Sequence, residues 1–114
     1  MARYEHLKIY KSAFDLAIYF EKVCMGFSRY NKYTLGTEVR NLAREVLKLI
    51  INANNSEYKN DALQNIREKL EELKVILRIC KEVRAFNNYN SFEYAVKRVI
   101  DISRQNEGWL RSYR

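Results

Sequence analysis

The chain has 114 residues, and its 21 lysines and arginines exceed its 14 acidic residues, which gives a formal net charge of +7. This length suffices for one hydrophobic core and is too short for two ordinary domains, so we expect a single domain over residues 1–114. A hydrophobic content of 47% excludes a disordered chain, and the regular interruption by charges excludes a membrane span. The amino terminus carries no secretion or transit signal, so we expect a cytoplasmic protein without a membrane partner.

The composition favours long, uninterrupted helices, because proline is absent and only three glycines occur. From residue 5 to residue 25, apolar side chains recur at steps of three and four, which predicts a first helix that ends at Gly26. A basic connector follows, and its Tyr30 and Tyr33 either close the end of a bundle or stack on unpaired bases. Thr34 is expected to cap a second helix with a heptad pattern. Its apolar positions are Leu35, Val39, Leu42, Val46, Leu49 and Ala53.

A third helix is expected after the polar residues 54–60, which interrupt the apolar pattern and predict a turn. Asn60 or Asp61 is expected to cap this helix, which keeps a heptad pattern and runs towards Phe86. Its apolar positions are Leu63, Ile66, Leu70, Leu73, Leu77 and Cys80.

A fourth helix is expected after the asparagine-rich residues 87–90, with Ser91 as its cap and Gly108 near its end. Because all three connectors are short, neighbouring helices should run antiparallel. The sequence therefore predicts an all-α fold, an antiparallel up-down-up-down four-helix bundle.

Two of the expected helices carry more apolar residues than one buried stripe needs. Large apolar patches are rarely left in water, and assembly with further copies of the same chain commonly covers them. The excess therefore predicts a homo-oligomer, although a small bundle that buries wide helix faces would show the same pattern. The residues concerned are Ile50 and Ile51 in the second helix and Val75, Ile76, Ile79 and Val83 in the third.

The residues that enzymes and metal sites need are scarce in this chain. His6 is the one histidine and falls beside the amino terminus, which excludes the paired Glu-x-x-His motifs of di-iron bundles and makes a poor catalytic base. Cys24 and Cys80 occupy apolar helix positions and form no Cys-x-x-Cys pair, so we expect buried thiols. These observations predict a protein without enzyme activity, cofactor or metal.

Basic residues recur at helical spacing. Arg40, Arg44 and Lys48 lie on one face of the second helix, because successive members are four residues apart. Such a surface attracts RNA, DNA or other polyanions, whereas pairing with nearby glutamates would leave surface ion pairs worth about 0.2 to 0.5 kcal/mol each. The other candidate residues for binding a partner or nucleic acid are Arg67, Lys74, Arg78, Lys81, Arg84, Arg104 and Arg111.

Three segments are the most distinctive parts of the sequence. They are the basic, tyrosine-rich run 27–40 with Tyr33-Thr34-Leu35-Gly36, the third-helix segment 73–78, and the pair Gly108-Trp109. They resemble the accessory variability determinant (Avd) proteins of diversity-generating retroelements. The resemblance implies a four-helix bundle that forms a closed pentameric ring and associates with a reverse transcriptase. It also implies that Lys74 and Arg78 support this association, with Lys74 in the place of an expected arginine.

On this resemblance, we expect a non-enzymatic accessory protein that binds a reverse transcriptase and RNA or DNA, and that supports mutagenic cDNA synthesis and retrohoming. Two alternatives share the pattern. The related four-helix proteins encoded in ribosomal-RNA intervening sequences have a similar fold and ring assembly. A helical adaptor that binds only proteins would use its basic residues for solubility alone.

Overall fold

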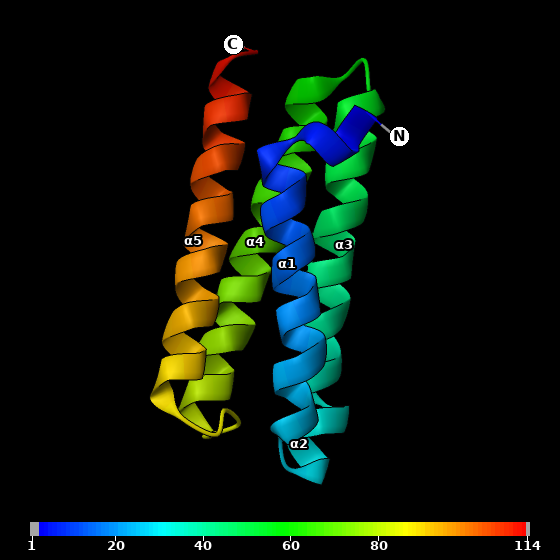
Figure 1. Cartoon of the computed structure of the whole chain (residues 1–114). Coiled ribbons are helices and arrows are strands. Elements are labelled where there is room, and N and C mark those ends of the chain that lie inside the picture. The colour runs from blue at the N-terminus through cyan, green and yellow to red at the C-terminus, as the bar shows by residue number, and fades with distance from the viewer. Residues whose placement is uncertain (1–2, 114) are drawn as a thin grey trace.

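Four long helices make up most of the structure, a computed structural model that describes residues 3–113 (Figure 1). Their bounds are Lys8–Val23 (α1), Leu35–Asn55 (α3), Lys59–Glu82 (α4) and Tyr89–Arg111 (α5). Between α1 and α3, a 3-10 turn spans Cys24–Gly26 and a short helix, α2, spans Arg29–Tyr33. A further 3-10 turn, Arg3–His6, precedes α1. The described part of the chain is thus all-α, as predicted.

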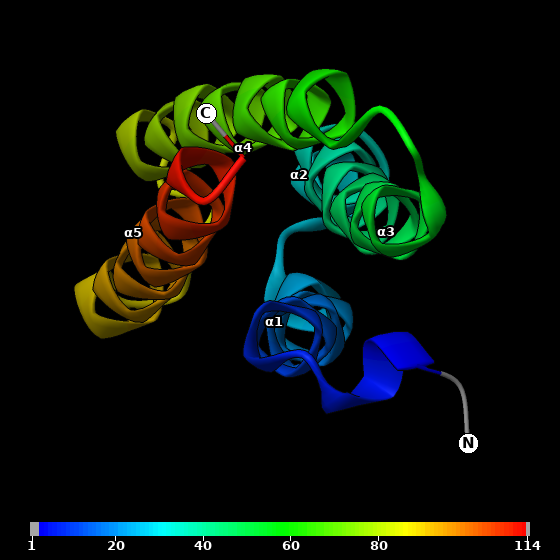
Figure 2. The same ribbon diagram turned by 90° about the horizontal axis from the view of Figure 1, so that it is seen from above.

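The long helices stand at the corners of a bundle in the cyclic order α1, α3, α4, α5, and each packs against its two neighbours in that cycle (Figure 2). Helices α1 and α4 are therefore diagonal to one another. Successive helices run in opposite directions (Figure 1), which confirms the up-down-up-down bundle. Helix α2 and the α4–α5 turn lie at one end, whereas α1 starts and α5 ends at the other. Within residues 3–113, no helix has the length and apolar character needed to cross a membrane.

Helix α4 supplies the most regular part of the core. Its predicted apolar positions all point inwards, and burial of one leucine or isoleucine stabilises the fold by about 1.5 to 3 kcal/mol. Exposure is at most 1% for each of Leu63, Ile66, Leu70, Leu73, Leu77 and Cys80. The heptad prediction for this helix is confirmed.

Helix α3 buries a slightly different face from the predicted one. Leu42 and Leu49 are only half-buried, whereas Ala43 and Ile50 lie in the core, with Ile50 at 0% exposure. The reason is that α3 packs against both α1 and α4, so its innermost side chains point between those two neighbours. The prediction that Ile50 is surplus to the core is therefore wrong.

Two predicted helix caps are displaced. Helix α5 begins at Tyr89, because Asn88 Oδ1 accepts a hydrogen bond from Ser91 N at 2.9 Å. Asparagine and serine are almost equally good caps, so cap preference alone does not favour Ser91 over Asn88. Helix α4 begins at Lys59 without a side-chain cap, so neither Asn60 nor Asp61 has the predicted function.

Helix α4 also ends earlier than the predicted Phe86. Arg84 adopts a left-handed conformation with φ of 58°, and Ala85 N donates to Cys80 O at 2.8 Å while Arg84 N donates to Lys81 O at 3.1 Å. This pair of hydrogen bonds is a Schellman motif, which normally places glycine at the left-handed position. A residue with a Cβ atom there costs about 1 to 2 kcal/mol.

The connection between α1 and α3 is more structured than a simple connector. Ser28 Oγ accepts from Asn31 N and caps α2. Thr34 occupies the N-cap position of α3 as predicted, but its hydroxyl donates to Tyr30 O instead of accepting from the helix. Tyr30 and Tyr33 are 73% and 66% exposed, so they do not close the end of the bundle.

Gly36 permits the close approach of this connection to α3. A Cβ atom at this position would lie 3.3 Å from Asn31 O and 3.6 Å from Cys24 Cβ. Gly26, the predicted end of the first helix, instead closes the 3-10 turn that follows α1, and it has no left-handed φ.

The two thiols lie in the core, as predicted: Cys24 is 1% and Cys80 is 0% exposed. Burial raises the pKa of Cys24 to about 11 and that of Cys80 to about 12. Both values exceed the unfolded pKa of about 8.5 to 9, so the native state keeps protons that the unfolded state releases. The resulting stability is complete below about pH 8.5 and is lost as the pH rises through the folded pKa values.

We therefore expect the free energy of unfolding to fall between about pH 9 and pH 11. In Cys80→Ala the fall should be less steep, and the two slopes should differ by up to about 1.4 kcal/mol per pH unit. Urea unfolding of both proteins across this range measures the two slopes. Equal slopes would show that the thiol is ionised in the native state.

Candidate functional site

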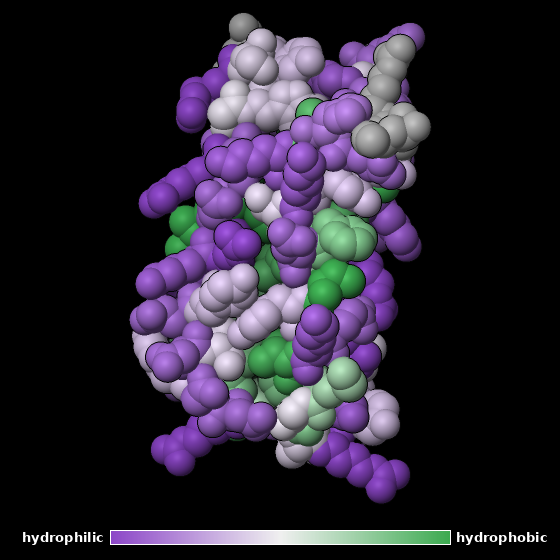
Figure 3. All heavy atoms as spheres, viewed as in Figure 1, coloured by the Kyte–Doolittle hydropathy of each residue, from purple (hydrophilic) through white to green (hydrophobic). Residues whose placement is uncertain are grey.

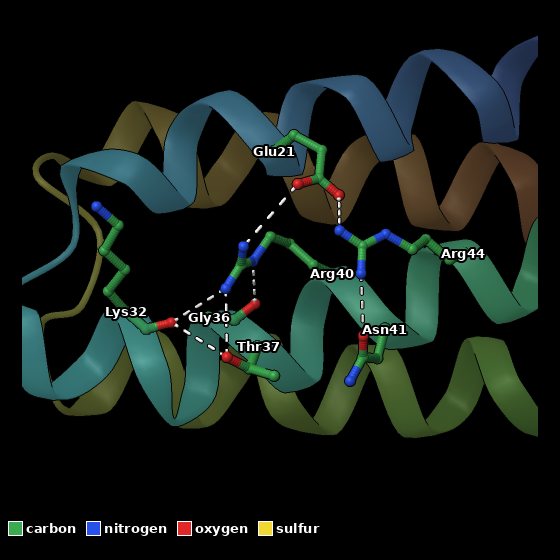
Figure 4. A network of polar contacts seen from close by, with 7 residues as sticks. All are labelled: Glu21, Lys32, Gly36, Thr37, Arg40, Asn41 and Arg44. Atoms are coloured by element: carbon green, nitrogen blue, oxygen red, sulfur yellow. Dashed lines mark hydrogen bonds and ion pairs between the residues drawn. The ribbon is translucent and has the colours of Figure 1, made fainter.

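Two predicted binding residues of α3 belong to a network that ties this helix to α1 (Figure 4). Arg44 Nη2 lies 2.5 Å from Glu21 Oε2, and Arg40 Nη1 lies 3.9 Å from Glu21 Oε1. Arg44 Nη1 also donates to Asn41 Oδ1 at 3.1 Å. One carboxylate of α1 thus holds both arginines of α3.

Arg40 additionally closes the junction between α2 and α3. Its Nε donates to Gly36 O at 3.1 Å, and its Nη2 donates to Lys32 O at 3.4 Å and to Thr37 Oγ1 at 3.2 Å. Carbonyl groups at the end of a helix lack partners within the helix, and Arg40 supplies one to α2. Lys48 shares the face of these arginines, but it is exposed and has no ion pair within residues 3–113.

Helix α4 carries a second set of basic residues, on the side that faces α5. The basic stripe of α4 consists of Arg67, Lys74, Arg78 and Lys81. Arg67 makes a bidentate ion pair with Glu107 of α5, with Nε–Oε2 and Nη2–Oε1 distances of 3.1 and 2.7 Å. This hydrogen bond raises the pKa of Arg67.

The next two members of the stripe, Lys74 and Arg78, are more accessible to a partner than Arg67 is. Lys74 Nζ pairs with Glu71 on its own helix at 2.9 Å, an exposed contact between residues three apart. Arg78 is exposed and makes no ion pair with any residue that the structure describes. The two residues that the family resemblance singles out are therefore adjacent, and solvent reaches both.

Lys81 and Arg84 lie at the end of α4, beside the turn into α5. The ammonium group of Lys81 is 5.5 Å from the ring centroid of Phe92 and 5.8 Å from that of Tyr89. The last two candidates, Arg104 and Arg111, are exposed on α5 and form no ion pair within the described chain. The ten candidates thus occupy several separate surfaces of the bundle.

Two groups of apolar side chains are exposed on diagonal helices. The apolar stripe of α4 consists of Val75, Ile79 and Val83, which are 56%, 41% and 51% exposed and lie beside the basic stripe. The apolar patch of α1 consists of Phe14 and Ile18, which are 45% and 41% exposed. Figure 3 shows apolar side chains at the surface among polar ones on the face where α1 lies.

The apolar stripe of α4 borders a hollow between α3 and α4, with a volume of about 530 Å³. Leu42, Val75 and Ile76 form its apolar part. Glutamates surround it, namely Glu38, Glu45 and Glu72, together with Lys69. This hollow is suited to apolar or cationic groups and repels nucleic acid.

A family model described as bAvd-like matches residues 7–113, which is nearly the whole chain. The chain belongs to the bAvd-like family. The match confirms the resemblance to Avd proteins that the sequence suggested. Members of the bAvd-like family are generally non-catalytic accessory proteins of diversity-generating retroelements. No curated protein sequence matches the chain.

In this bAvd-like protein, several contacts join residues that are far apart in the sequence. Glu21, the partner of two arginines, carries no signal in the sequence pattern, because it lies on a different helix from them. The sequence pattern predicts a turn at Tyr89, but this half-exposed residue is the first of α5 and lies beside Lys81. In residues 3–113, no three side chains of His, Cys, Asp or Glu come together as metal ligands would.

Proposed function

We propose that this bAvd-like protein is a non-enzymatic accessory subunit of a diversity-generating retroelement, which binds the reverse transcriptase and RNA or DNA during mutagenic cDNA synthesis and retrohoming. The observation that carries the proposal is the family match over residues 7–113. The open part of the basic stripe of α4 supports it, because the two positions that the resemblance links to the reverse transcriptase lie there.

The reverse transcriptase would contact α4 through Lys74 and Arg78. Both side chains are on the surface, and the one carboxylate that pairs with them, Glu71, is itself exposed. Exposed pairs of this kind contribute little to stability, so exchanging Glu71 for a carboxylate of a partner has a small energetic cost. Arginine also offers a planar donor group that suits bidentate recognition of a carboxylate.

Self-association would use the two apolar groups. The apolar patch of α1 and the apolar stripe of α4 lie on diagonal helices, so one subunit presents them in different directions. Contacts between two different surfaces of the same chain are heterologous, and they close into a ring when the rotation between subunits allows it. This arrangement supports the pentameric ring that the family resemblance implies.

Nucleic-acid binding would draw on the excess of basic residues, since the net charge is +7. Cations that neutralise phosphates release counterions, and the affinity then falls steeply as the salt concentration rises. Among the ten candidate residues, those that are exposed and make no ion pair in the described chain are Lys48, Arg78, Lys81, Arg84, Arg104 and Arg111.

Affinity purification of the tagged protein from its native host, with and without nuclease treatment, tests the proposal. We expect a reverse transcriptase and its template RNA in the untreated sample, and the reverse transcriptase alone after nuclease treatment. Recovery of ribosomal material without a reverse transcriptase would contradict the proposal and favour the intervening-sequence proteins. Partners that are insensitive to both salt and nuclease and include no reverse transcriptase would favour a protein adaptor.

A further inference from the structure

A pocket with a volume of about 530 Å³ lies at the turn between α4 and α5. Ligand pockets for small organic groups commonly have volumes of about 300 to 1,000 Å³. Its lining includes two cations, Lys81 and Arg84, and, within the described residues, no carboxylate. The hollow between α3 and α4 has the same volume but three glutamates in its lining. Of these two openings, the pocket at the turn is the one that attracts an anion.

Lys81 is held in place without a counter-ion. No carboxylate of the described chain pairs with it, and its ammonium group instead lies over the rings of Phe92 and Tyr89, at 5.5 and 5.8 Å from their centroids. A cation–π contact orients an ammonium group but does not neutralise it. The full charge of Lys81 is therefore available to a phosphate.

Arg84 occupies a position that favours glycine. It has a φ of 58° and forms the left-handed residue of the motif that ends α4. Strained backbone conformations in non-glycine residues often mark functional positions. Arg84 lines the pocket, where its guanidinium group can bind a phosphate in a bidentate manner.

Aromatic and amide groups complete the lining. Tyr89 is 58% exposed, so part of its ring remains open to a flat ligand. The side chain of Asn87 makes no hydrogen bond within the described chain, and its amide offers both donors and an acceptor. These groups match the parts of a nucleotide. The aromatic ring can stack on the face of the base, the two cations can bind the phosphate, and the free amide can form hydrogen bonds with the edge of the base.

We propose that this pocket holds one unpaired nucleotide of a single-stranded nucleic acid, with the base against Tyr89 and the phosphate between Lys81 and Arg84. The inference rests on the nucleic-acid binding proposed above, and it names the site. It also explains why a cation stands at a position that favours glycine.

Further exposed aromatic residues lie at the same end of the bundle as the pocket. Phe86 of the pocket packs against Phe27, with ring centroids 5.3 Å apart, and Phe27 directly precedes the segment that leads into α2. Helix α2 lies at the same end of the bundle as the α4–α5 turn (Figure 1) and exposes Tyr30 and Tyr33. Exposed aromatic rings at intervals are typical of surfaces that stack successive bases.

The test measures binding of a fluorescent single-stranded oligoadenylate of about twelve nucleotides to the full chain over a range of salt concentrations. We expect Tyr89→Ala to weaken binding by about tenfold at unchanged salt slope, because stacking is lost and the phosphate contacts remain. Lys81→Gln and Arg84→Gly should each reduce the slope of log affinity against log salt by about one. AMP and duplex RNA serve as competitors.

Two features keep the outcome interpretable. Arg84→Gly relieves the left-handed strain, so its Tm should equal or exceed that of the wild type, and a loss of binding then reflects the missing cation. Lys11→Gln removes an exposed charge near the start of α1, at the opposite end of the bundle (Figure 1), and should change neither the affinity beyond about twofold nor the salt slope by as much as one unit.

Competition by duplex RNA as strong as that by the oligoadenylate would overturn the proposal. Competition by AMP that Tyr89→Ala abolishes would support the site and identify free nucleotides as a second source of the ligand. If the wild type binds RNA and the three pocket variants bind equally well, the pocket is not the site, but nucleic-acid binding stands. If the wild type binds no nucleic acid at low salt, both the pocket and the nucleic-acid binding proposed above are excluded.

Discussion

Replacing Lys74 and Arg78 together by glutamate is expected to weaken association with the reverse transcriptase by at least about thirtyfold. Charged residues at the centre of an interface commonly contribute 2 kcal/mol or more, and like charges placed opposite one another add a repulsive term. The fold should tolerate the change, because both side chains lie on the surface and the pair between Lys74 and Glu71 is worth only about 0.2 to 0.5 kcal/mol. Pull-down of the reverse transcriptase after nuclease treatment measures the effect.

The matched control reverses two charges elsewhere. Lys8 and Lys11 are exposed at the start of α1, so Lys8→Glu with Lys11→Glu changes the net charge by the same amount away from α4. This control should retain association, and circular dichroism should show equal helicity in all three proteins. Wild-type association of the Lys74/Arg78 variant, or an equal loss in the control, would exclude the basic stripe of α4 as the contact.

Ile79→Glu is expected to dissociate the proposed homo-oligomer, with a dissociation constant at least about a hundredfold higher. The side chain is 41% exposed in the single chain, so glutamate is readily hydrated there. At a subunit contact, the same carboxylate would be buried without a partner, which costs several kcal/mol. Sedimentation equilibrium measures the mass of the assembly. Ile100→Glu on α5 provides the same substitution at a residue that is 36% exposed and outside both apolar groups, and it should leave the mass unchanged.

A mixing experiment distinguishes the heterologous contact from a symmetric one. Phe14→Glu should also give monomers, since it places a charge in the apolar patch of α1. Each variant keeps one intact surface, so Phe14→Glu and Ile79→Glu together should form a dimer and nothing larger. An assembly of full mass in the Phe14→Glu variant alone would show that α1 has no part in the contact.

The sequence predicted the parts of the fold that depend on local periodicity. Every predicted core position of α4, from Leu63 to Cys80, is buried, because a heptad pattern over 18 residues admits one inward face. The bundle topology followed from short connectors in the same way. Where two residues competed for one role, as Asn88 and Ser91 did for the cap of α5, the pattern alone did not decide between them.

Features that depend on other helices were not predictable. Arg40 and Arg44 form a regular basic stripe in the sequence, but both make ion pairs with Glu21 of α1. The sequence of α3 does not reveal this partner. Asn106, with 1% exposure, donates from Nδ2 to Leu63 O at 3.0 Å, a contact between residues 43 positions apart. The sequence does not reveal the left-handed conformation of Arg84, because the usual signal for such a position is glycine.

The placement of α2 and the α4–α5 turn at the same end of the bundle has a consequence for any ring closed through its sides. In a cyclic assembly whose axis runs along the helices, every subunit directs this end towards the same rim. A long single-stranded nucleic acid that is bound at one subunit is then present at a high local concentration at the binding site of the next subunit. Avidity of this kind multiplies weak individual contacts by a factor of about 10² to 10⁴, so affinity should depend on strand length far more than on sequence.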